Sequence, residues 1–269
     1  MITATSLLLA ALAALPAVQA QDCSPLHYIF ARATTEPPTN VENASPEEFE
    51  EAANKFWSKG YGAAGHSIFT NITALIPDAT GYPVHYPASF GASSPRAGQK
   101  DLLDHITAMS QQCPDQKYVL GGHSQGGVVT VNTIPEIPAE ILSRVIAVTM
   151  VGSPDCPSEV DDRCRSYCNK GDFICDGGLG GIGGIGGGIG GIGGGLGGLF
   201  GRRSLGAKFK NAGMLKTRQV PDCSGPEPEE KGHEAGGGLS AHLAYNEDGF
   251  YIYAAACYVQ KQYQASGAV

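Results

Sequence analysis

One serine in this sequence lies in a setting that could make it a nucleophile. Ser124 is the central residue of Gly122-His-Ser-Gln-Gly126, which fits the pattern G-x-S-x-G. In that pattern a strand turns sharply into a helix, and the strained turn lifts the serine hydroxyl clear of the backbone. Glycine is needed on both sides because a Cβ atom there would collide with the neighbouring strand and helix. However, 38 glycines in 269 residues make a chance match to this pattern a real risk.

The residues on either side of Ser124 have the pattern that such a turn requires. Tyr118-Val-Leu120 is a short apolar run that predicts a buried strand, and Val128-Val-Thr-Val131 predicts the start of a helix. The N-terminus of that helix would point its unpaired N–H groups at the reacting oxygen. This context supports a nucleophilic serine more strongly than the five-residue motif does.

A serine hydroxyl needs an imidazole to accept its proton, and the imidazole needs a carboxylate to orient it. For a serine on this kind of turn, the acid and then the histidine follow it in the chain. Only His233 and His242 follow Ser124. We expect His242 to be the base, because the glycine-rich sequence around His233 is too mobile to hold an oriented ring. His123 is expected to line the site, since adjacent residues in a tight turn diverge.

Several carboxylates could orient this histidine. The candidates are Glu136, Glu140, Asp155, Glu159, Asp161, Asp162, Asp172 and Asp176. Asp172 lies between Cys168 and Cys175, and a disulfide between those two cysteines would hold its carboxylate in a small rigid loop.

The carbonyl oxygen that a serine attacks becomes negatively charged and needs hydrogen-bond donors. The backbone N–H of Gln125, the residue after the nucleophile, is one expected donor. A second donor should come from a loop after an early strand. Leu26–Ala31 predicts that strand and Arg32–Glu36 the loop, in which Thr34 could offer both its N–H and its hydroxyl.

Apolar strands and amphipathic helices alternate around these residues. The predicted strands are Leu26–Ala31, Tyr82–Tyr86, Tyr118–Leu120 and Arg144–Val151. Predicted helices start at Ser45, which is the N-cap before Pro46, and at Ser67, Arg96 and Asn246. This alternation predicts a mostly parallel sheet with right-handed connections, covered by helices.

The first 20 residues predict a signal peptide that is removed before Gln21. They carry no charged side chain, have an apolar core at Leu7–Leu15 and end in small residues. That core is too short for a transmembrane helix. We therefore expect a secreted protein, and the sequons at Asn43 and Asn71 predict N-glycosylation.

Eight cysteines follow residue 20, and an even number in a secreted chain predicts four disulfides. A metal site is not expected, because the sequence has no C-x2-C pair and no nearby histidine cluster. The net charge of −8 argues against nucleic acid as a partner.

One long segment differs in composition from the rest of the chain. Leu179–Phe200 consists of Gly-Gly-Ile and Gly-Gly-Leu units, and Lys208–Gly238 is polar and irregular. So much glycine opposes the entropy loss of a fixed helix. We predict one domain, made of residues 21–176 and 239–269, interrupted by a flexible insertion at 177–238.

Taken together, these residues resemble the fungal cutinase and acetylxylan esterase family. Arg32-Ala-Thr-Thr-Glu36 is similar to the R-G-S-T-E oxyanion loop of that family, and Cys113-Pro-Asp followed by Gly122–Gly126 is similar to its elbow region. Gly171-Asp-Phe-Ile-Cys175 is similar to its acid loop, G-D-x-[IV]-C. His242-Leu-Ala-Tyr245 is similar to its H-x-x-Y segment.

The resemblance implies a role for each of these positions. It implies Ser124 as nucleophile, His242 as base, Asp172 as orienting acid, and Thr34 and Gln125 as oxyanion donors. It also implies the disulfides Cys23–Cys113 and Cys168–Cys175, and leaves the pairing of Cys156, Cys164, Cys223 and Cys257 open. The implied fold is a small three-layer α/β-hydrolase with a five-stranded parallel sheet and no lid helix.

The implied activity is that of a secreted serine carboxylester hydrolase, a monomer that needs no metal and no other cofactor. Cutin is the favoured substrate, with acetylxylan or another short-acyl ester as the alternative. A different class of function is a non-catalytic protein that binds surfaces through its Gly/Ile/Leu tract. The complete catalytic set argues against that second class.

The sequence departs from the family pattern at three places. Ala33 and Thr34 stand where the family has Gly-Ser, which narrows or stiffens the oxyanion loop. His123 stands where it has Tyr, beside the nucleophile. The insertion between acid and histidine is much longer than usual, and could cover or extend the acyl pocket. No catalytic residue is lost.

Overall fold

Buried apolar runs supply most strands of a parallel sheet. The computed structural model describes residues 23–153, 155–175 and 220–267. Within them the sheet has the order β2-β1-β3-β4-β5-β6, and every neighbouring pair is parallel. The strands are β1 Leu26–Ala31, β2 Thr80–Pro83, β3 Lys117–His123, β4 Val145–Val151, β5 Cys164–Asn169 and β6 Lys231–His233.

The described sheet therefore has six strands, where five were expected. The layered parallel architecture agrees with the α/β-hydrolase prediction, so the correction concerns the edge of the sheet. β6 has only three residues, Lys-Gly-His, and their side chains are exposed or half-buried. A short edge strand needs no apolar face, so it leaves no hydrophobic pattern in the sequence.

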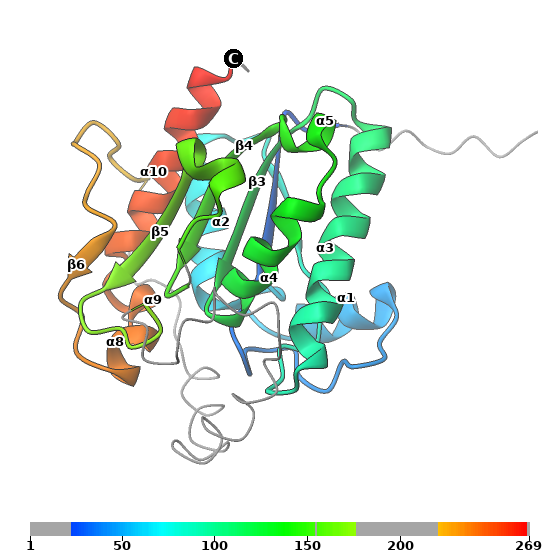
Figure 1. Ribbon diagram of the computed structural model, residues 1–269, viewed down its shortest axis with the longest axis horizontal. Coiled ribbons are helices and arrows are strands. Elements are labelled where there is room, and N and C mark those ends of the chain that lie inside the picture. The colour runs from blue at the N-terminus through cyan, green and yellow to red at the C-terminus, as the bar shows by residue number, and fades with distance from the viewer. Residues whose placement is uncertain (1–22, 154, 176–219, 268–269) are drawn as a thin grey trace, which may run out of the picture.

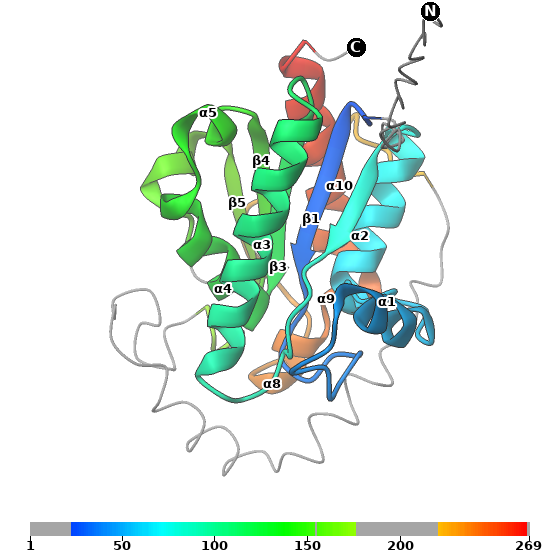
Figure 2. The ribbon, with the colours of Figure 1, turned by 90° about the vertical axis from the view of Figure 1, so that its right-hand side faces the viewer.

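Helices cover both faces of this sheet (Figures 1 and 2). The helices are α1 Pro46–Asn54, α2 Gly62–Leu75, α3 Ser93–Gln112, α4 Gln125–Thr133, α5 Ala139–Leu142, α8 Leu239–Leu243, α9 Tyr245–Asp248 and α10 Phe250–Ala265. Two short 3-10 helices, η1 Ile134–Glu136 and η2 Ser158–Arg163, follow α4 and β4. Ser45 is the N-cap of α1 and Pro46 occupies its first turn, as the sequence predicts; Glu48 completes a capping box with Ser45.

Alternation along the strands divides the core into two halves. Tyr28, Phe30 and Val119 face α2 and α10 on one side, whereas Ile29 and Leu120 face α3 and α4 on the other. Because successive side chains of a strand point to opposite faces, a strand covered by helices on both sides is apolar throughout. The burial of all six residues of β1 is the result of this.

Four disulfides connect the eight cysteines. Cys23 is bonded to Cys113 and Cys168 to Cys175, the two pairs that the family resemblance implies. The remaining bonds are Cys156–Cys164 and Cys223–Cys257, which the sequence left open. Cys223–Cys257 ties the segment before β6 to α10 across 34 residues.

The last part of the predicted insertion has a defined structure. Residues 177–219 lie outside the described residues, but 220–238 contains β6 and is held by the Cys223–Cys257 bond. Residues 220–238 therefore have a described structure, and the division of the chain at residues 176 and 239 stays a prediction. A three-residue strand and a single disulfide leave no periodic pattern of apolar residues, so the sequence predicts irregular structure for this segment.

Two other expectations concern the surface and the N-terminus. Asn71 is buried in α2, and its side-chain amide donates to the carbonyl oxygen of Ser67 at 2.7 Å, so the folded chain does not present this sequon for glycosylation. Asn43 is exposed.

The predicted signal peptide lies outside the described residues. None of the helices in the described part of the chain combines the length and apolar character that a membrane span needs.

Candidate active site

Ser124 lies at the turn between β3 and α4 in the strained conformation that the motif predicts. Its φ is 56° and its ψ is −117°, which a residue with a side chain rarely adopts. A Cβ on Gly122 would lie 2.2 Å from the backbone carbonyl of Gly126, and one on Gly126 would lie 1.9 Å from the Ala31 oxygen. The two glycines therefore let α4 start directly against β1 and β3, which fixes the direction of the serine side chain.

The structure brings Ser124, His242 and Asp172 into one hydrogen-bonded chain. The Nε2 atom of His242 is 2.9 Å from the Ser124 hydroxyl, and its Nδ1 atom is 3.0 Å from both carboxylate oxygens of Asp172. Because a carboxylate only accepts, Nδ1 carries the hydrogen and Nε2 is free to accept from the serine. Asp172 is fully buried and His242 nearly so, whereas Ser124 is half-buried at the end of the chain.

Asp172 is held ionised by its donors. Burial raises the pKa of its carboxyl, but hydrogen bonds from His242, Tyr245 and the Ile174 N–H outweigh burial and bring the pKa below its usual value. It lies in the loop that follows β5, closed by the Cys168–Cys175 bond. The carboxylate is therefore charged at neutral pH and has a fixed orientation.

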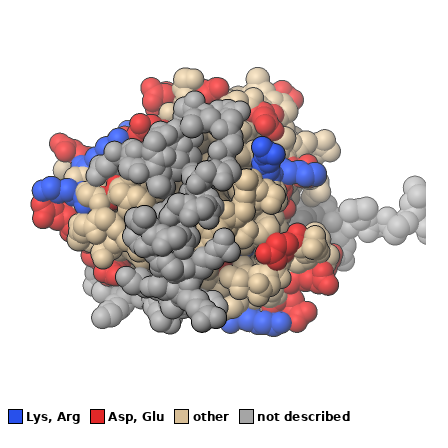
Figure 3. All heavy atoms as spheres, turned by 60° about the horizontal axis from the view of Figure 1, so that its bottom comes forward, with Lys and Arg blue, Asp and Glu red and all other residues tan. Residues whose placement is uncertain are grey.

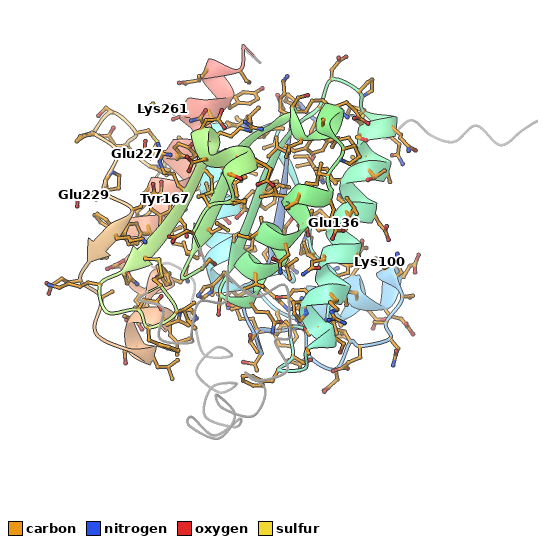
Figure 4. All side chains as sticks on the ribbon, in the orientation of Figure 1. Lys100, Glu136, Tyr167, Glu227, Glu229 and Lys261 are labelled. Atoms are coloured by element: carbon orange, nitrogen blue, oxygen red, sulfur yellow. A yellow bond between two sulfur atoms is a disulfide. The ribbon has the colours of Figure 1, made fainter. Side chains whose placement is uncertain are left out.

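The other described acid candidates lie elsewhere. Asp155 pairs with Lys231, and Asp162 with Arg163. Glu136 ends η1, beyond α4 in the helical layer (Figure 4). Asp176 lies outside the described residues.

His233 differs from expectation in its surroundings. It belongs to β6, where its Nε2 atom is 2.6 Å from a carboxylate oxygen of Asp248 and its ring stacks on Phe250 at 4.0 Å. It is thus fixed rather than mobile. The Nε2 atom of His233 is bonded to Asp248, and it is His242 that contacts Ser124.

His123 packs behind the proposed base. It is 4% exposed, its ring centroid is 5.3 Å from that of His242, and its Nε2 atom is 3.3 Å from the His242 carbonyl oxygen. Burial, and then the neighbouring His242, lowers the pKa of His123 to about 3. The residue therefore stays neutral at ordinary pH and can donate a hydrogen bond to the main chain that carries His242.

Gln125 is the first residue of α4, so its backbone N–H has no hydrogen-bond acceptor within that helix. The first bonds to the Ser124 carbonyl come from the N–H groups of Gly127 and Val128. The Gln125 side chain is fixed beside it: Nε2 donates to the Ser89 carbonyl at 2.9 Å, and Oε1 accepts from the Ser94 hydroxyl at 3.1 Å. The backbone N–H is consequently a preorganised donor at the turn.

Thr34 lies half-buried in the loop that follows β1. The β1–β3 register pairs Ala31 with Gly122, so this loop and the turn at Ser124 leave the sheet side by side. Both are at the carboxyl ends of parallel strands, where open α/β sheets bind ligands. On this face the described charged side chains lie mainly toward the rim (Figure 3).

Two buried polar side chains, Arg32 and Glu36, hold the loop that contains Thr34. The Arg32 guanidinium donates to the carbonyl oxygens of Glu36, Pro38 and Tyr86 at 2.9, 2.8 and 2.6 Å. The Glu36 carboxylate accepts from the N–H groups of Ala33 and Ala63 at 2.7 and 2.8 Å. In the sequence, Arg32 and Glu36 are only the ends of the motif that contains Thr34. In the structure they anchor both ends of the loop.

Tyr245 is a site residue whose contacts the sequence could not reveal. Its hydroxyl lies 2.6 Å from the second carboxylate oxygen of Asp172, 73 residues away in sequence. Its position three residues after His242 was the available signal. Among the described residues, no three His, Cys, Asp or Glu side chains are placed to hold a metal ion.

The chain is similar in sequence to several cutinases. Residues 51–182 match the family model described as Cutinase. A cutinase of Botryotinia fuckeliana is 31% identical over 165 residues, which cover 60% of this chain and 74% of that protein. A cutinase of Monilinia fructicola is 29% identical over 181 residues, covering 64% and 82%. The solved structure of Trichoderma reesei cutinase with a phosphonate inhibitor is 26% identical, covers 58% of this chain and 65% of that one, and gives a TM-score of 0.44.

Proposed function

Because this chain belongs to the cutinase family, we propose that it is a secreted serine carboxylester hydrolase that works through an acyl-enzyme on Ser124. The single observation that carries the assignment of residues is the hydrogen-bonded chain from Asp172 through His242 to Ser124. It ends at a half-buried hydroxyl on a strained turn, which is the geometry of an activated serine.

In the first half of the reaction, Ser124 Oγ attacks the ester carbonyl carbon while His242 Nε2 takes its proton. The imidazolium that forms is stabilised by the buried Asp172 carboxylate. The Gln125 N–H and the Thr34 N–H or hydroxyl stabilise the oxyanion, since both come from segments fixed beside the nucleophile. When the tetrahedral intermediate collapses, His242 gives its proton to the leaving alkoxide, and the alcohol departs.

In the second half, water attacks the acyl-enzyme. His242 takes a proton from the water, the same donors stabilise the second oxyanion, and the proton then returns to Ser124 Oγ as the carboxylic acid leaves. The enzyme is regenerated in its starting protonation state. The reaction as a whole consumes one water for each ester bond cleaved.

Replacing Ser124 tests the mechanism directly. Ser124→Ala should abolish p-nitrophenyl butyrate hydrolysis and keep the wild-type circular dichroism spectrum and melting temperature. Ser143→Ala is a matched control, because this exposed hydroxyl only donates to the Glu140 carbonyl and should be dispensable. Wild-type protein that folds but hydrolyses no ester would instead support the surface-binding class of function.

Cutin, a polyester of hydroxy-fatty acids, is the substrate class that we favour. Family membership supports this choice, and acetylxylan or another short-acyl ester is the competing substrate. A chain-length series of p-nitrophenyl esters, measured beside cutin and acetylated xylan, separates them. Hydrolysis of both cutin and medium-chain esters supports a polyesterase, whereas release of acetate alone supports a short-acyl esterase.

We also propose that the protein acts outside the cell as a monomer. The uncharged, apolar residues 1–20 and the four disulfides support an extracellular location. The intact mass of the secreted protein should correspond to a chain that begins at Gln21. A mass that includes residues 1–20, or elution as a dimer in size-exclusion chromatography, would contradict these points.

A further inference from the structure

The acid of the catalytic chain has a partner besides the histidine. The Tyr245 hydroxyl is 2.6 Å from Asp172 Oδ2, while the N–H of Asn169 is 2.9 Å from the same hydroxyl oxygen. A backbone N–H can only donate, so the phenol oxygen accepts from Asn169. The phenol hydrogen is thereby directed to Asp172, and the direction of this hydrogen bond is fixed by the geometry.

Tyr245 has no alternative protonation state that would weaken this bond. Its side chain is 2% exposed, and burial, followed by the charge of Asp172, raises its pKa far above the ordinary tyrosine value. The phenol therefore remains a donor throughout the range in which an esterase works. Asp172 in turn has its Oδ1 atom bonded to the Ile174 N–H at 3.0 Å, so each carboxylate oxygen has a donor besides His242.

The same short segment carries both the base and this phenol. His242 lies in α8 and Tyr245 starts α9, three residues later, which places both side chains on one side of the segment. The Asn169 side chain also donates to the Ala241 carbonyl at 2.8 Å. The end of β5, the acid loop and the His242 segment thus form one hydrogen-bonded unit in which Tyr245 is the central link.

We propose that Tyr245 is a positioning residue for the reaction, acting through Asp172. Its hydroxyl keeps the carboxylate ionised and holds Oδ2 in the plane that faces His242 Nδ1. It spreads the negative charge over a further donor, which weakens the attraction of the carboxylate for the imidazolium proton. This inference rests on the proposed function and extends it to a residue that does not touch substrate.

Tyr245→Phe tests the proposal because it removes only the hydroxyl. The kcat for p-nitrophenyl butyrate should fall roughly tenfold with KM unchanged, because the Asp172 carboxylate is no longer held where it orients His242 toward Ser124. The acid limb of kcat/KM should move to higher pH by about half a unit or more, because the carboxylate with fewer donors attracts the imidazolium proton more strongly. A purely structural role would lower the melting temperature without moving this limb.

Tyr251→Phe is the matched control. Tyr251 is equally buried, its hydroxyl accepts from the His233 N–H and donates to the Glu229 carbonyl, both at 3.3 Å, and it makes no contact with Asp172. The control should lose thermal stability and keep the wild-type pH profile. If the two variants give the same profile, or if Tyr245→Phe keeps the wild-type kcat and acid limb, the proposal is wrong.

A second substitution covers the case in which Tyr245→Phe does not fold. Site-specific replacement of Tyr245 by 3,5-difluorotyrosine keeps both hydrogen bonds and makes the phenol a stronger donor. The acid limb should then move to lower pH, opposite to the Phe variant, and an unchanged limb would overturn the proposal. Wild type and Ser124→Ala are measured alongside: activity lost only in Ser124→Ala shows that the proposed function holds even where this inference fails.

Discussion

At the residue scale, two histidines in contact have different roles because their surroundings differ. His242 reaches Ser124 and Asp172 with its two ring nitrogens, so it can pass a proton. His123 is buried behind it with a pKa lowered to about 3, and its hydrogen bond goes to the His242 main chain. With so low a pKa, His123 is too weak a base to take the serine proton, but its hydrogen bond can fix the backbone of His242, the proposed base.

Replacing His123 with Phe should separate these roles. The change keeps an aromatic ring against His242 and Tyr245 but removes the donor to the His242 carbonyl, so we expect kcat to fall a few-fold and stability to fall by about 1 kcal/mol. The acid limb of the rate profile should not move, because His123 is neutral throughout that range. A shifted limb in the pH dependence of kcat/KM would contradict this assignment.

At the element scale, the site depends on how closely α4 begins against β1. The loop after β1 and the turn at Ser124 leave the sheet at the neighbouring positions Ala31 and Gly122. Arg32 and Glu36 hold the loop after β1 by hydrogen bonds to backbone groups. The catalytic side chains therefore come from the ends of strands and from loops that are pinned at both ends. Rigid support of this kind is what preorganised catalysis requires.

Gly126→Ala should destabilise the protein strongly, although it removes no functional side chain. Its Cβ would lie 1.9 Å from the Ala31 oxygen, which forces β1 and α4 apart and should cost at least about 3 kcal/mol. The melting temperature and the soluble yield measure the effect. Gly225→Ala is the matched control, since a Cβ there meets no atom within 4 Å. Equal stability of the two variants would contradict the account.

At the scale of the whole molecule, a row of packed aromatic and histidine rings joins the edge of the sheet to the helical layers. Phe49, His85, Tyr82, His105 and His27 follow one another at centroid distances of 4.0, 4.7, 3.5 and 5.2 Å. His27 and His105 face each other through their Nε2 atoms at 2.9 Å, which leaves room for one hydrogen between them. Protonating both would place two cations in contact.

This row should make the protein sensitive to acid. Burial lowers the pKa of His27 and His85 to about 4 and that of His105 to about 3. Below the unfolded value of about 6.5, the unfolded chain binds more protons, so stability falls as pH falls from about 6.5 toward these values. Glu36 and Asp101, whose pKa values burial raises to about 7 and 6, oppose this loss but are outnumbered.

Thermal unfolding at several pH values measures this sensitivity. The melting temperature of the wild type should drop steadily between pH 6.5 and 4, and His105→Phe, which keeps a ring on Tyr82, should show a smaller drop. Any decrease in the melting temperature of His105→Phe at pH 7.5 measures altered packing. The effect of titration is therefore taken from the difference between the melting temperatures at neutral and acid pH. An equal drop in both proteins would mean that this row does not determine acid stability.

The local parts of this structure could be predicted from sequence, and the long-range parts could not. The buried strands, the cap at Ser45 and the turn at Ser124 follow from patterns of a few residues. Chain rigidity and the family resemblance led to the proposal of His242 and Asp172, which lie in one hydrogen-bonded chain with Ser124. The contact of Tyr245 with Asp172, the Cys223–Cys257 bond and β6 depend on how distant segments meet, which no local pattern records.

The most direct test of the central claim is covalent labelling with a serine-directed phosphonate ester. We expect the intact mass to increase by one phosphonyl group, esterase activity to disappear in parallel, and peptide mapping to place the adduct on Ser124, with no labelling of Ser124→Ala. Active protein that becomes labelled on another residue, or that hydrolyses esters after Ser124 is fully modified, would contradict the account.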